Sequence, residues 1–267
     1  MTTSFQRAFR TVLVLAAVLL AIALAPGRAF AHEAIPNTTG EGTWGDPVLI
    51  VGGSEAERQN KAWNALVAAL ELKENLYIKV SGTVGTSTLD TPDETFVAGS
   101  ALVTIPQGYA KDLELDEGAR VHYAQRFRNG DGLPSYANGE SVPFGSVIKN
   151  YGALTVHGPQ SGTYAHLGGN SPHASYSVIS NYGELNVYGC VEIDASFNGS
   201  NIYGYKFGRG IACEHEKSTL VVGDNGEAAS SPRFVGESLN SDKTNDVAAG
   251  IFVRRAKTVD MFNGRLE

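Results

Sequence analysis

One segment of thirteen residues is written twice in this chain with few changes. The first copy, SVIKNYGALTVHG, spans residues 146–158, and the second, SVISNYGELNVYG, spans residues 177–189. Two weaker copies follow, and the equivalent isoleucines of the four copies are 31, 32 and 40 residues apart: Ile148, Ile179, Ile211 and Ile251. Because a unit that returns to the same apolar positions at such a period is the signature of a solenoid, the repeat predicts stacked coils.

Each copy reads as a strand, a tight corner and a second strand of alternating apolar residues. The corner is Asn-Tyr-Gly, and we expect Asn and Gly there because both tolerate a left-handed backbone. Equivalent strands would stack in parallel about 4.8 Å apart. This stacking would place Asn150 over Asn181 as a side-chain ladder and Tyr151 over Tyr182 as an aromatic stack.

Short alternating runs cut by Gly, Asn, Asp and Pro continue to the end of the chain. The sequence therefore predicts an all-β fold, a parallel β-helix solenoid, over residues 73–267. In its first strand Leu76, Ile78 and Val80 point one way, whereas Tyr77, Lys79 and Ser81 point the other. The alternative is a sandwich in which two antiparallel hairpins happen to look alike.

The one convincing helical pattern spans residues 54–72, SEAERQNKAWNALVAALEL. Ser54 and Glu57 have the spacing of a capping box. The apolar positions recur at helical spacing and form one face: Trp63, Leu66, Val67 and Leu70. Since the open end of a solenoid exposes core residues, we expect this amphipathic helix to cap the N-terminal end of the coils.

Residues 1–31 predict a secretory signal peptide, with Arg7 and Arg10 before an uncharged apolar run and RAFA at its end. Its removal leaves 18 basic against 28 acidic residues. That balance disfavours nucleic acid and anionic membranes as partners. We expect a secreted or cell-surface protein with no membrane insertion after cleavage, in which residues 32–53 form an extended leader.

Two cysteines, Cys190 and Cys213, remain in an exported chain, and we expect a disulfide between them. Cys213 is equivalent to Asn181 of the previous unit, whereas Cys190 follows the second strand of its own unit. A bridge would therefore have to cross between neighbouring faces, or one coil would have to be shorter. A zinc site would need two further ligands, and we predict no metal and no cofactor.

The aromatic stretch NIYGYKFG is the predicted ligand-binding segment. Tyr203, Tyr205 and Phe207 alternate along it, so the three rings can lie on one face and stack on sugars. The other interpretation is that these rings fill the core or line one corner of a coil.

Glu192 and Asp194 share one face of a short strand, which suits either a pair of ligands or a solvated surface. A polysaccharide lyase would need clustered carboxylates for calcium and a nearby base, which Arg254 or Arg255 would supply. These arginines equally suit a surface that resists edge pairing. Nothing in the sequence selects one pair of carboxylates or forms a nucleophile elbow, so no catalytic residue is predicted.

The repeated unit, the export signal and the strand LYIKVSGTV after a cap helix resemble secreted right-handed parallel β-helix proteins of the pectate-lyase-like superfamily. They look most like the adhesin-like surface proteins of Gram-positive bacteria. The resemblance covers residues 54–267 and implies a right-handed coil. It implies less about function, since one fold hosts many functions.

The sequence supports three hypotheses of function. The first is a non-enzymatic β-helix that acts as an adhesin-like scaffold, or as a module that binds an extracellular glycan or a host or cell-surface protein. The second is a polysaccharide lyase or glycoside hydrolase acting on acidic polysaccharides, favoured if Glu192, Asp194 and one of the two arginines share a groove. The third is that these residues are the N-terminal part of a larger surface protein.

Overall fold

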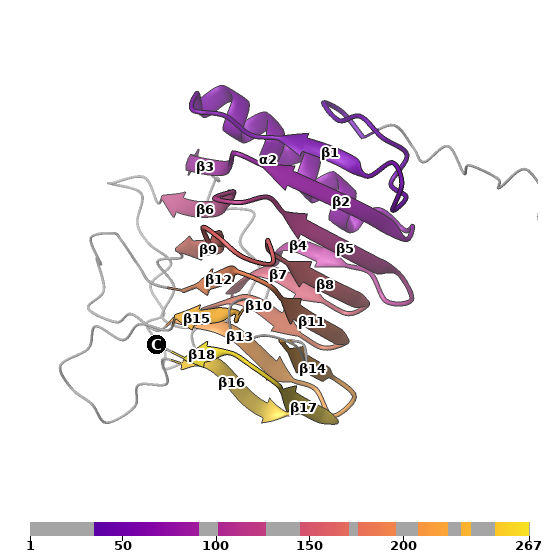
Figure 1. Cartoon of the computed structure of the whole chain (residues 1–267), viewed down its shortest axis with the longest axis vertical. Helices are drawn as coiled ribbons and strands as arrows, with labels where there is room; N and C mark the ends of the chain where they lie inside the picture. The colour runs from indigo at the N-terminus through magenta and orange to yellow at the C-terminus, as the bar shows by residue number, and fades with distance from the viewer. Residues whose placement is uncertain are drawn as a thin grey trace, which may run out of the picture. The chain divides into compact units, whose positions relative to one another are not determined.

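The computed structural model describes residues 35–90, 101–126, 145–170, 176–195, 208–223, 231–235 and 249–266. The predicted signal peptide lies outside these ranges. Within them, strands are stacked one beyond another from β1 and β2 at one end to β16, β17 and β18 at the other (Figure 1).

The strands form three parallel sheets. The seven-stranded sheet contains β1 (Val48–Val51), β2 (Leu76–Ser81), β5 (Ala110–Leu115), β8 (Ala153–His157), β11 (Glu184–Tyr188), β14 (Thr219–Val222) and β17 (Thr258–Met261). The five-stranded sheet contains β4 (Ala101–Ile105), β7 (Gly145–Asn150), β10 (Tyr176–Asn181), β13 (Gly208–Glu214) and β16 (Ala249–Arg255). The six-stranded sheet contains β3 (Thr83–Asp90), β6 (Arg120–Arg126), β9 (Ala165–Asn170), β12 (Val191–Asp194), β15 (Arg233–Val235) and β18 (Arg265–Leu266).

From β4 onward the chain visits the five-, seven- and six-stranded sheets in turn, and then begins the same circuit again. Each strand pairs with the strand three places later in the chain, as β5 does with β8 and β8 with β11. The prediction of a mostly parallel β fold with one helix is confirmed. The arrangement is consistent with a β-helix-like solenoid. Each coil has a third strand at a place where the sequence pattern predicted only a turn.

The repeat predicted the register of the coils correctly. Ile148 pairs with Ile179, and Ile179 pairs with Ile211, as expected from their equivalent positions. Ile211 in turn pairs with Ile251 across a step that is eight residues longer in sequence. The longer step therefore keeps the pairing from Arg209 to Cys213, and a register irregularity follows only after Cys213.

The predicted asparagine ladder is present and fully buried. Asn150 donates from Nδ2 to Oδ1 of Asn181 over 3.0 Å and to the carbonyl oxygen of Glu184 over 2.7 Å. Asn181 donates in the same way to the carbonyl oxygen of Thr219 over 2.9 Å. Each asparagine thus joins its own coil to the next one at the corner, where the ladder of strand hydrogen bonds is interrupted.

The predicted tyrosine stack is also present. The ring centroids of Tyr151 and Tyr182 are 5.0 Å apart with an interplanar angle of 30°. The Lys149 ammonium lies 5.5 Å from the first ring centroid and 5.2 Å from the second. Because the rings cover one another and a cation lies over both, this row stabilises the corner.

The reason for glycine at these corners differs from the expected one. Neither Gly152 nor Gly183 has a left-handed backbone, and neither does the asparagine that precedes it. A Cβ atom at Gly183 would instead lie 2.1 Å from the carbonyl oxygen of Gly152, which shows how closely the coils approach. The corner therefore needs glycine for space and asparagine for its side-chain hydrogen bonds.

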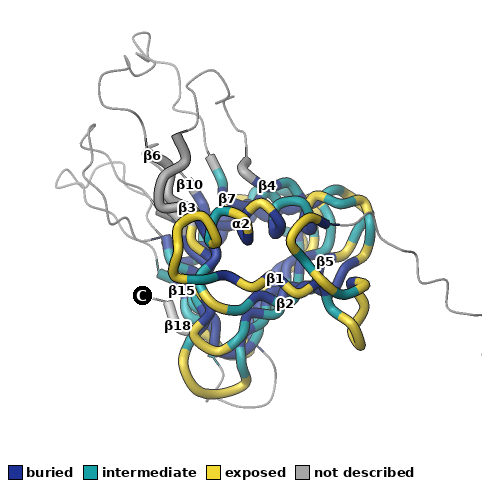
Figure 2. The backbone as a smooth tube through the Cα atoms, turned by 90° about the horizontal axis from the view of Figure 1, so that it is seen from above, coloured by how far each residue is buried: buried dark blue, intermediate teal, exposed yellow. Residues whose placement is uncertain are grey.

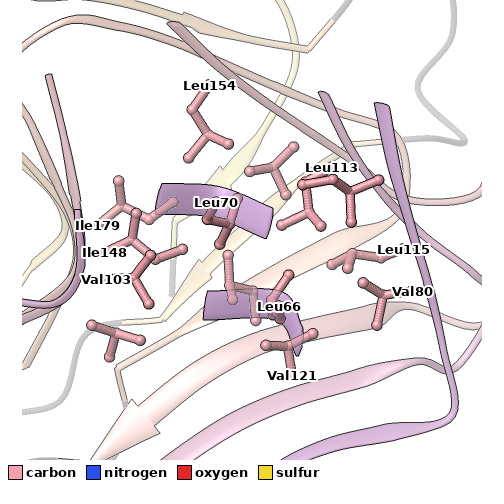
Figure 3. Packing of buried hydrophobic residues seen from close by; sticks show 14 of the residues in the cluster. Leu66, Leu70, Val80, Val103, Leu113, Leu115, Val121, Ile148, Leu154 and Ile179 are labelled. Carbon is pink, nitrogen blue, oxygen red and sulfur yellow. The ribbon is translucent and has the colours of Figure 1, made fainter. Parts of the chain in front are cut away.

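Helix α2 (Ala56–Glu71) covers the first end of the stack. It follows β1 and precedes β2, so it takes the place that a strand of the five-stranded sheet has in later coils, and it packs against β1, β3 and β4. One side of it is buried and the other exposed (Figure 2). Figure 3 shows Leu66 and Leu70 among residues of all three sheets: Val103, Ile148, Leu113, Leu115 and Val121.

The other end of the described stack shows what happens without such a cover. Leu220 and Val222 in β14 are fully buried, whereas their register partners in β17, Val259 and Met261, are 36% and 44% exposed. An inward-facing side chain is therefore buried only where a further element lies over it. At the β1 end that element is α2, as the sequence predicted.

The start of α2 differs from the expected capping box. The helix begins at Ala56 with Glu55 as its N-cap, and no side chain makes the cap hydrogen bond. The backbone N–H of Gly53 donates to the carbonyl oxygen of Thr83 over 3.0 Å, so the chain still pairs with β3 where the box was expected. Gln59 instead donates from Nε2 to the Gly53 carbonyl over 2.9 Å. No helix among the described residues has the length and apolarity needed to cross a membrane.

One inward position of the core carries a lysine. Lys111 pairs with Leu76 on one side and Leu154 on the other, and its side chain is almost fully buried. Its Nζ donates to the carbonyl oxygens of Leu72 over 2.7 Å and of Glu74 over 2.6 Å, just beyond the end of α2. The cation thus binds two backbone carbonyl groups that follow the C-terminus of α2, near the negative end of the helix dipole.

We predict that Leu66→Asp lowers the free energy of unfolding by more than about 3 kcal/mol, because it removes a buried leucine and places a carboxylate against core residues. The matched control is Asn64→Asp, which adds the same charge at an exposed position of α2. Chemical denaturation of both variants tests the cap. Equal effects of the two substitutions would show that α2 does not cover the core.

A second prediction concerns Lys111, whose pKa burial lowers to about 8 while the Glu74 carboxylate opposes the shift. Between pH 8 and its unfolded value of about 10.4, the unfolded chain binds more protons than the folded one, so this lysine makes stability rise with pH. Denaturation at several pH values between about 7.5 and 9.5 should show a steeper rise in the native chain than in Lys111→Met. Equal slopes would contradict the assignment.

Candidate functional site

The predicted carboxylate pair lies on the six-stranded sheet. Glu192 and Asp194 share the outer face of β12, as the alternation indicated. Arg254 and Arg255 are exposed on β16, in the five-stranded sheet, so the structure does not bring them together with the carboxylates. The predicted aromatic segment, Tyr203 to Phe207, lies outside the described residues.

Glu192 has neighbours on the adjacent strands that the sequence did not suggest. Its Oε1 lies 2.9 Å from Nδ1 of His166, and its Oε2 lies 3.9 Å from Nη1 of Arg233. The Arg233 guanidinium carbon lies 4.0 Å from the ring centroid of Tyr164, whose hydroxyl donates to the carbonyl oxygen of Ser231 over 2.8 Å. This carboxylate is therefore held by a histidine and an arginine and is not a simple solvated side chain.

The expected disulfide is not formed. Cys190 lies in the turn between β11 and β12, and Cys213 lies in β13, so the two buried thiols occupy different corners of the coil. Cys213 pairs with Asn181 in the register, and the asparagine Nδ2 lies 3.9 Å from its Sγ. Burial raises the pKa of Cys213 to about 11, so the thiol stays protonated at neutral pH.

The most exposed aromatic side chain among the described residues is Trp44, at the tip of a turn before β1. Thr43 and Asp46 close the turn with backbone hydrogen bonds of 3.0 and 3.2 Å, and the Asp46 N–H also lies 3.1 Å from Thr43 Oγ1. Gly40 is needed next to it, because a Cβ atom there would lie 1.8 Å from the carbonyl oxygen of Pro47. This fixed turn leaves the Trp44 side chain 77% exposed.

Trp44 rests on the outer face of the seven-stranded sheet. Its ring centroid lies 4.7 Å from that of Tyr77 in β2, with an interplanar angle of 62°, an edge-to-face contact. The Tyr77 N–H donates to the carbonyl oxygen of Gly42 over 2.8 Å, which ties the turn to β2. Tyr77 is on the face opposite to Leu76 and Ile78, as the alternation predicted, and on this outer face it is buried because Trp44 and His157 lie around it.

Next to Tyr77 is a network of charged side chains from β2 and β5. Lys79 lies 2.8 Å from Glu114 Oε1 and 3.0 Å from Asp116 Oδ1, and the Tyr77 hydroxyl donates to Glu114. Burial works against ionisation of Glu114, but the hydrogen bonds from Lys79 and Tyr77 outweigh it and lower its pKa. Burial and the same carboxylate raise the pKa of Tyr77. The pair of Lys79 and Glu114 is therefore ionised, with the tyrosine neutral.

A further carboxylate stands beside this network. Asp112 is the register partner of Tyr77, and its Oδ1 lies 2.9 Å from Nε2 of His157 in β8. Its side chain is 38% exposed. Oδ1 is itself buried, and within the described residues no donor is aligned to it for a hydrogen bond. The buried oxygen of Asp112 therefore faces His157, and the exposed part of the side chain lies elsewhere on the carboxylate.

We call this cluster the Trp44 face: Trp44, Tyr77, Lys79, Asp112, Glu114, Asp116 and His157. It offers an exposed ring and planar polar side chains on a rigid sheet. No group of three or more potential ligands in the described parts of the chain is arranged to hold a metal ion. The sequence missed this site because residues 32–53 read as a leader. The sequence feature that could have indicated this site is a tryptophan within TWGD, a segment whose Thr, Gly and Asp are typical of a turn.

Comparison with known proteins adds no assignment to this geometry. No protein-family model, no curated protein and no solved structure matches the chain. The role of the Trp44 face therefore has to be argued from its own chemistry.

Proposed function

We propose that this chain is a secreted or cell-surface right-handed parallel β-helix that binds an extracellular glycan through the Trp44 face. The observation that carries the proposal is Trp44, a large ring left exposed on a hydrogen-bonded turn. An exposed tryptophan held in one place loses little conformational entropy when it is covered. A ring held in this way beside polar side chains suits recognition of a ligand.

The chemistry of the surrounding side chains favours a sugar over an apolar partner. An aromatic ring surrounded by polar side chains suits a ligand that also combines an apolar face with polar groups, as a sugar ring does. Lys79 and His157 supply donors, whereas Asp112 and Glu114 supply acceptors beside the rings. They lie on neighbouring strands about 4.8 Å apart, so the hydroxyl groups of one extended chain can meet several of them.

The right-handed coil is part of the proposal. A connection that leaves one strand and returns to a parallel neighbour in the same sheet is right-handed in about 98% of known cases. The repeated circuit through three sheets consists of such connections. A rigid stack with polar outer faces suits an adhesin-like scaffold, since it holds a binding surface in a fixed geometry.

A second candidate function is favoured by the Glu192 cluster on the six-stranded sheet. A carboxylate between His166 and Arg233 has the residue types that general acid–base chemistry on an acidic polysaccharide requires. We rank it below binding because the arginines expected to complete it lie in another sheet.

We predict that Trp44→Ala lowers affinity for a bound glycan at least about tenfold, as loss of a central aromatic contact does at binding sites. The measurement is a glycan array with the purified secreted chain, followed by calorimetry on the strongest hit. Phe262→Ala is the control, since it removes another exposed ring from the last coil. Equal binding by the native chain and Trp44→Ala would refute the proposed site.

The same protein incubated with acidic polysaccharides should give no ultraviolet absorbance of unsaturated products. This assay separates the two candidate functions. A rising absorbance that disappears in Glu192→Gln would replace the binding proposal with a lyase on the six-stranded sheet. A flat trace for the native chain, with calcium and with chelator, agrees with a binding module.

A further inference from the structure

We infer that the Trp44 face selects glycans that carry free amino groups, and that it disfavours glycans built of uronic acids. The inference rests on the proposed function and adds the class of ligand. Its basis is the charge and the exposure of the side chains beside Trp44 and Tyr77.

The fixed charges of the face are mainly negative. Asp112, Glu114 and Asp116 stand against a single lysine, Lys79. That lysine lies within 3.0 Å of two carboxylates, which offset its positive charge toward a ligand anion even though its N–H groups can still donate. A polyanionic chain laid on this face would meet like charges, whereas a chain with ammonium groups would meet opposite ones.

Asp112 is the carboxylate that a ligand ammonium would meet. It is not paired with Lys79, and its side chain is 38% exposed, although its buried Oδ1 faces Nε2 of His157 at 2.9 Å. As the register partner of Tyr77 it lies one strand away from the ring on which Trp44 rests, at a spacing of about 4.8 Å. A sugar that stacks on Trp44 can therefore place an amino group on its ring, or on the next ring, beside Asp112.

The hydrogen bond between an ammonium donor and this carboxylate would be charge-assisted, and such bonds are about twice as strong as neutral ones. Glu114 is less suited to this role because Tyr77 and Lys79 already occupy it. Asp116 is likewise engaged by Lys79. The selectivity should therefore depend on Asp112 more than on either of its neighbours in β5 and the following turn.

The whole chain adds to this selectivity at longer range. After removal of the predicted signal peptide it has ten more acidic than basic residues. A net negative charge slows the approach of polyanions and favours that of polycations, most strongly at low salt. The local and the global charge thus favour the same class of ligand.

The test is calorimetry at low salt and at about pH 6, where sugar amines are protonated, with three probes of equal length. These are a hexamer of β-1,4-linked glucosamine, the same hexamer fully N-acetylated, and a hexamer of galacturonate. We expect the glucosamine hexamer to bind most tightly. Asp112→Asn should weaken that binding about five- to tenfold and leave the acetylated hexamer unchanged, since it removes one partly exposed charge pair.

Asp260→Asn is the matched control, because it removes an exposed carboxylate from β17 of the same sheet. Circular dichroism of each variant verifies that the fold is retained. Tightest binding of galacturonate, or no effect of Asp112→Asn, would overturn the inference while Trp44-dependent binding still supports the proposed function. Loss of any Trp44-dependent binding, across these probes and the array, would overturn both.

Discussion

The structure depends on the mutual cover of successive coils. Side chains that point inward from one coil are buried by the equivalent side chains of the coils on either side, and the ends of the stack lack one of these partners. Burial of apolar surface contributes about 25 cal/mol per Å², so an uncovered end is costly. At the β1 end, Leu66 and Leu70 of α2 supply the missing layer, and the chain uses a helix where later coils have a strand.

Polar groups inside such a stack have to be satisfied by the neighbouring coils as well. Asn150 and Asn181 do this at the corner between the five- and seven-stranded sheets, where each side chain joins two coils. Lys111 does it just beyond α2, where its ammonium donates to two backbone carbonyl groups. These residues occupy core positions, and each is tolerated because its hydrogen bonds are made within the protein.

The outer faces follow from the same stacking. Residues about 35 to 45 positions apart become neighbours when their strands pair, so Lys79 meets Glu114, and Asp112 meets His157 of the next coil. A charged row on a parallel sheet is therefore assembled from several coils. Trp44 joins it through a turn that precedes the first strand. The face is a property of the register, and the recognition we propose depends on that register being rigid.

The sequence by itself determined the parallel β architecture, the register of the later coils, the asparagine and tyrosine rows and the capping helix. All of these rest on local periodicity or on a repeat that is visible in one chain. Only the tertiary structure decided which outer residues meet, why Gly152 and Gly183 are needed, and that Cys190 and Cys213 occupy different corners. It alone placed Lys111 at the helix end and Trp44 on Tyr77. The physical reason is that these contacts join residues far apart in the chain, and their partners are set by how the coils stack.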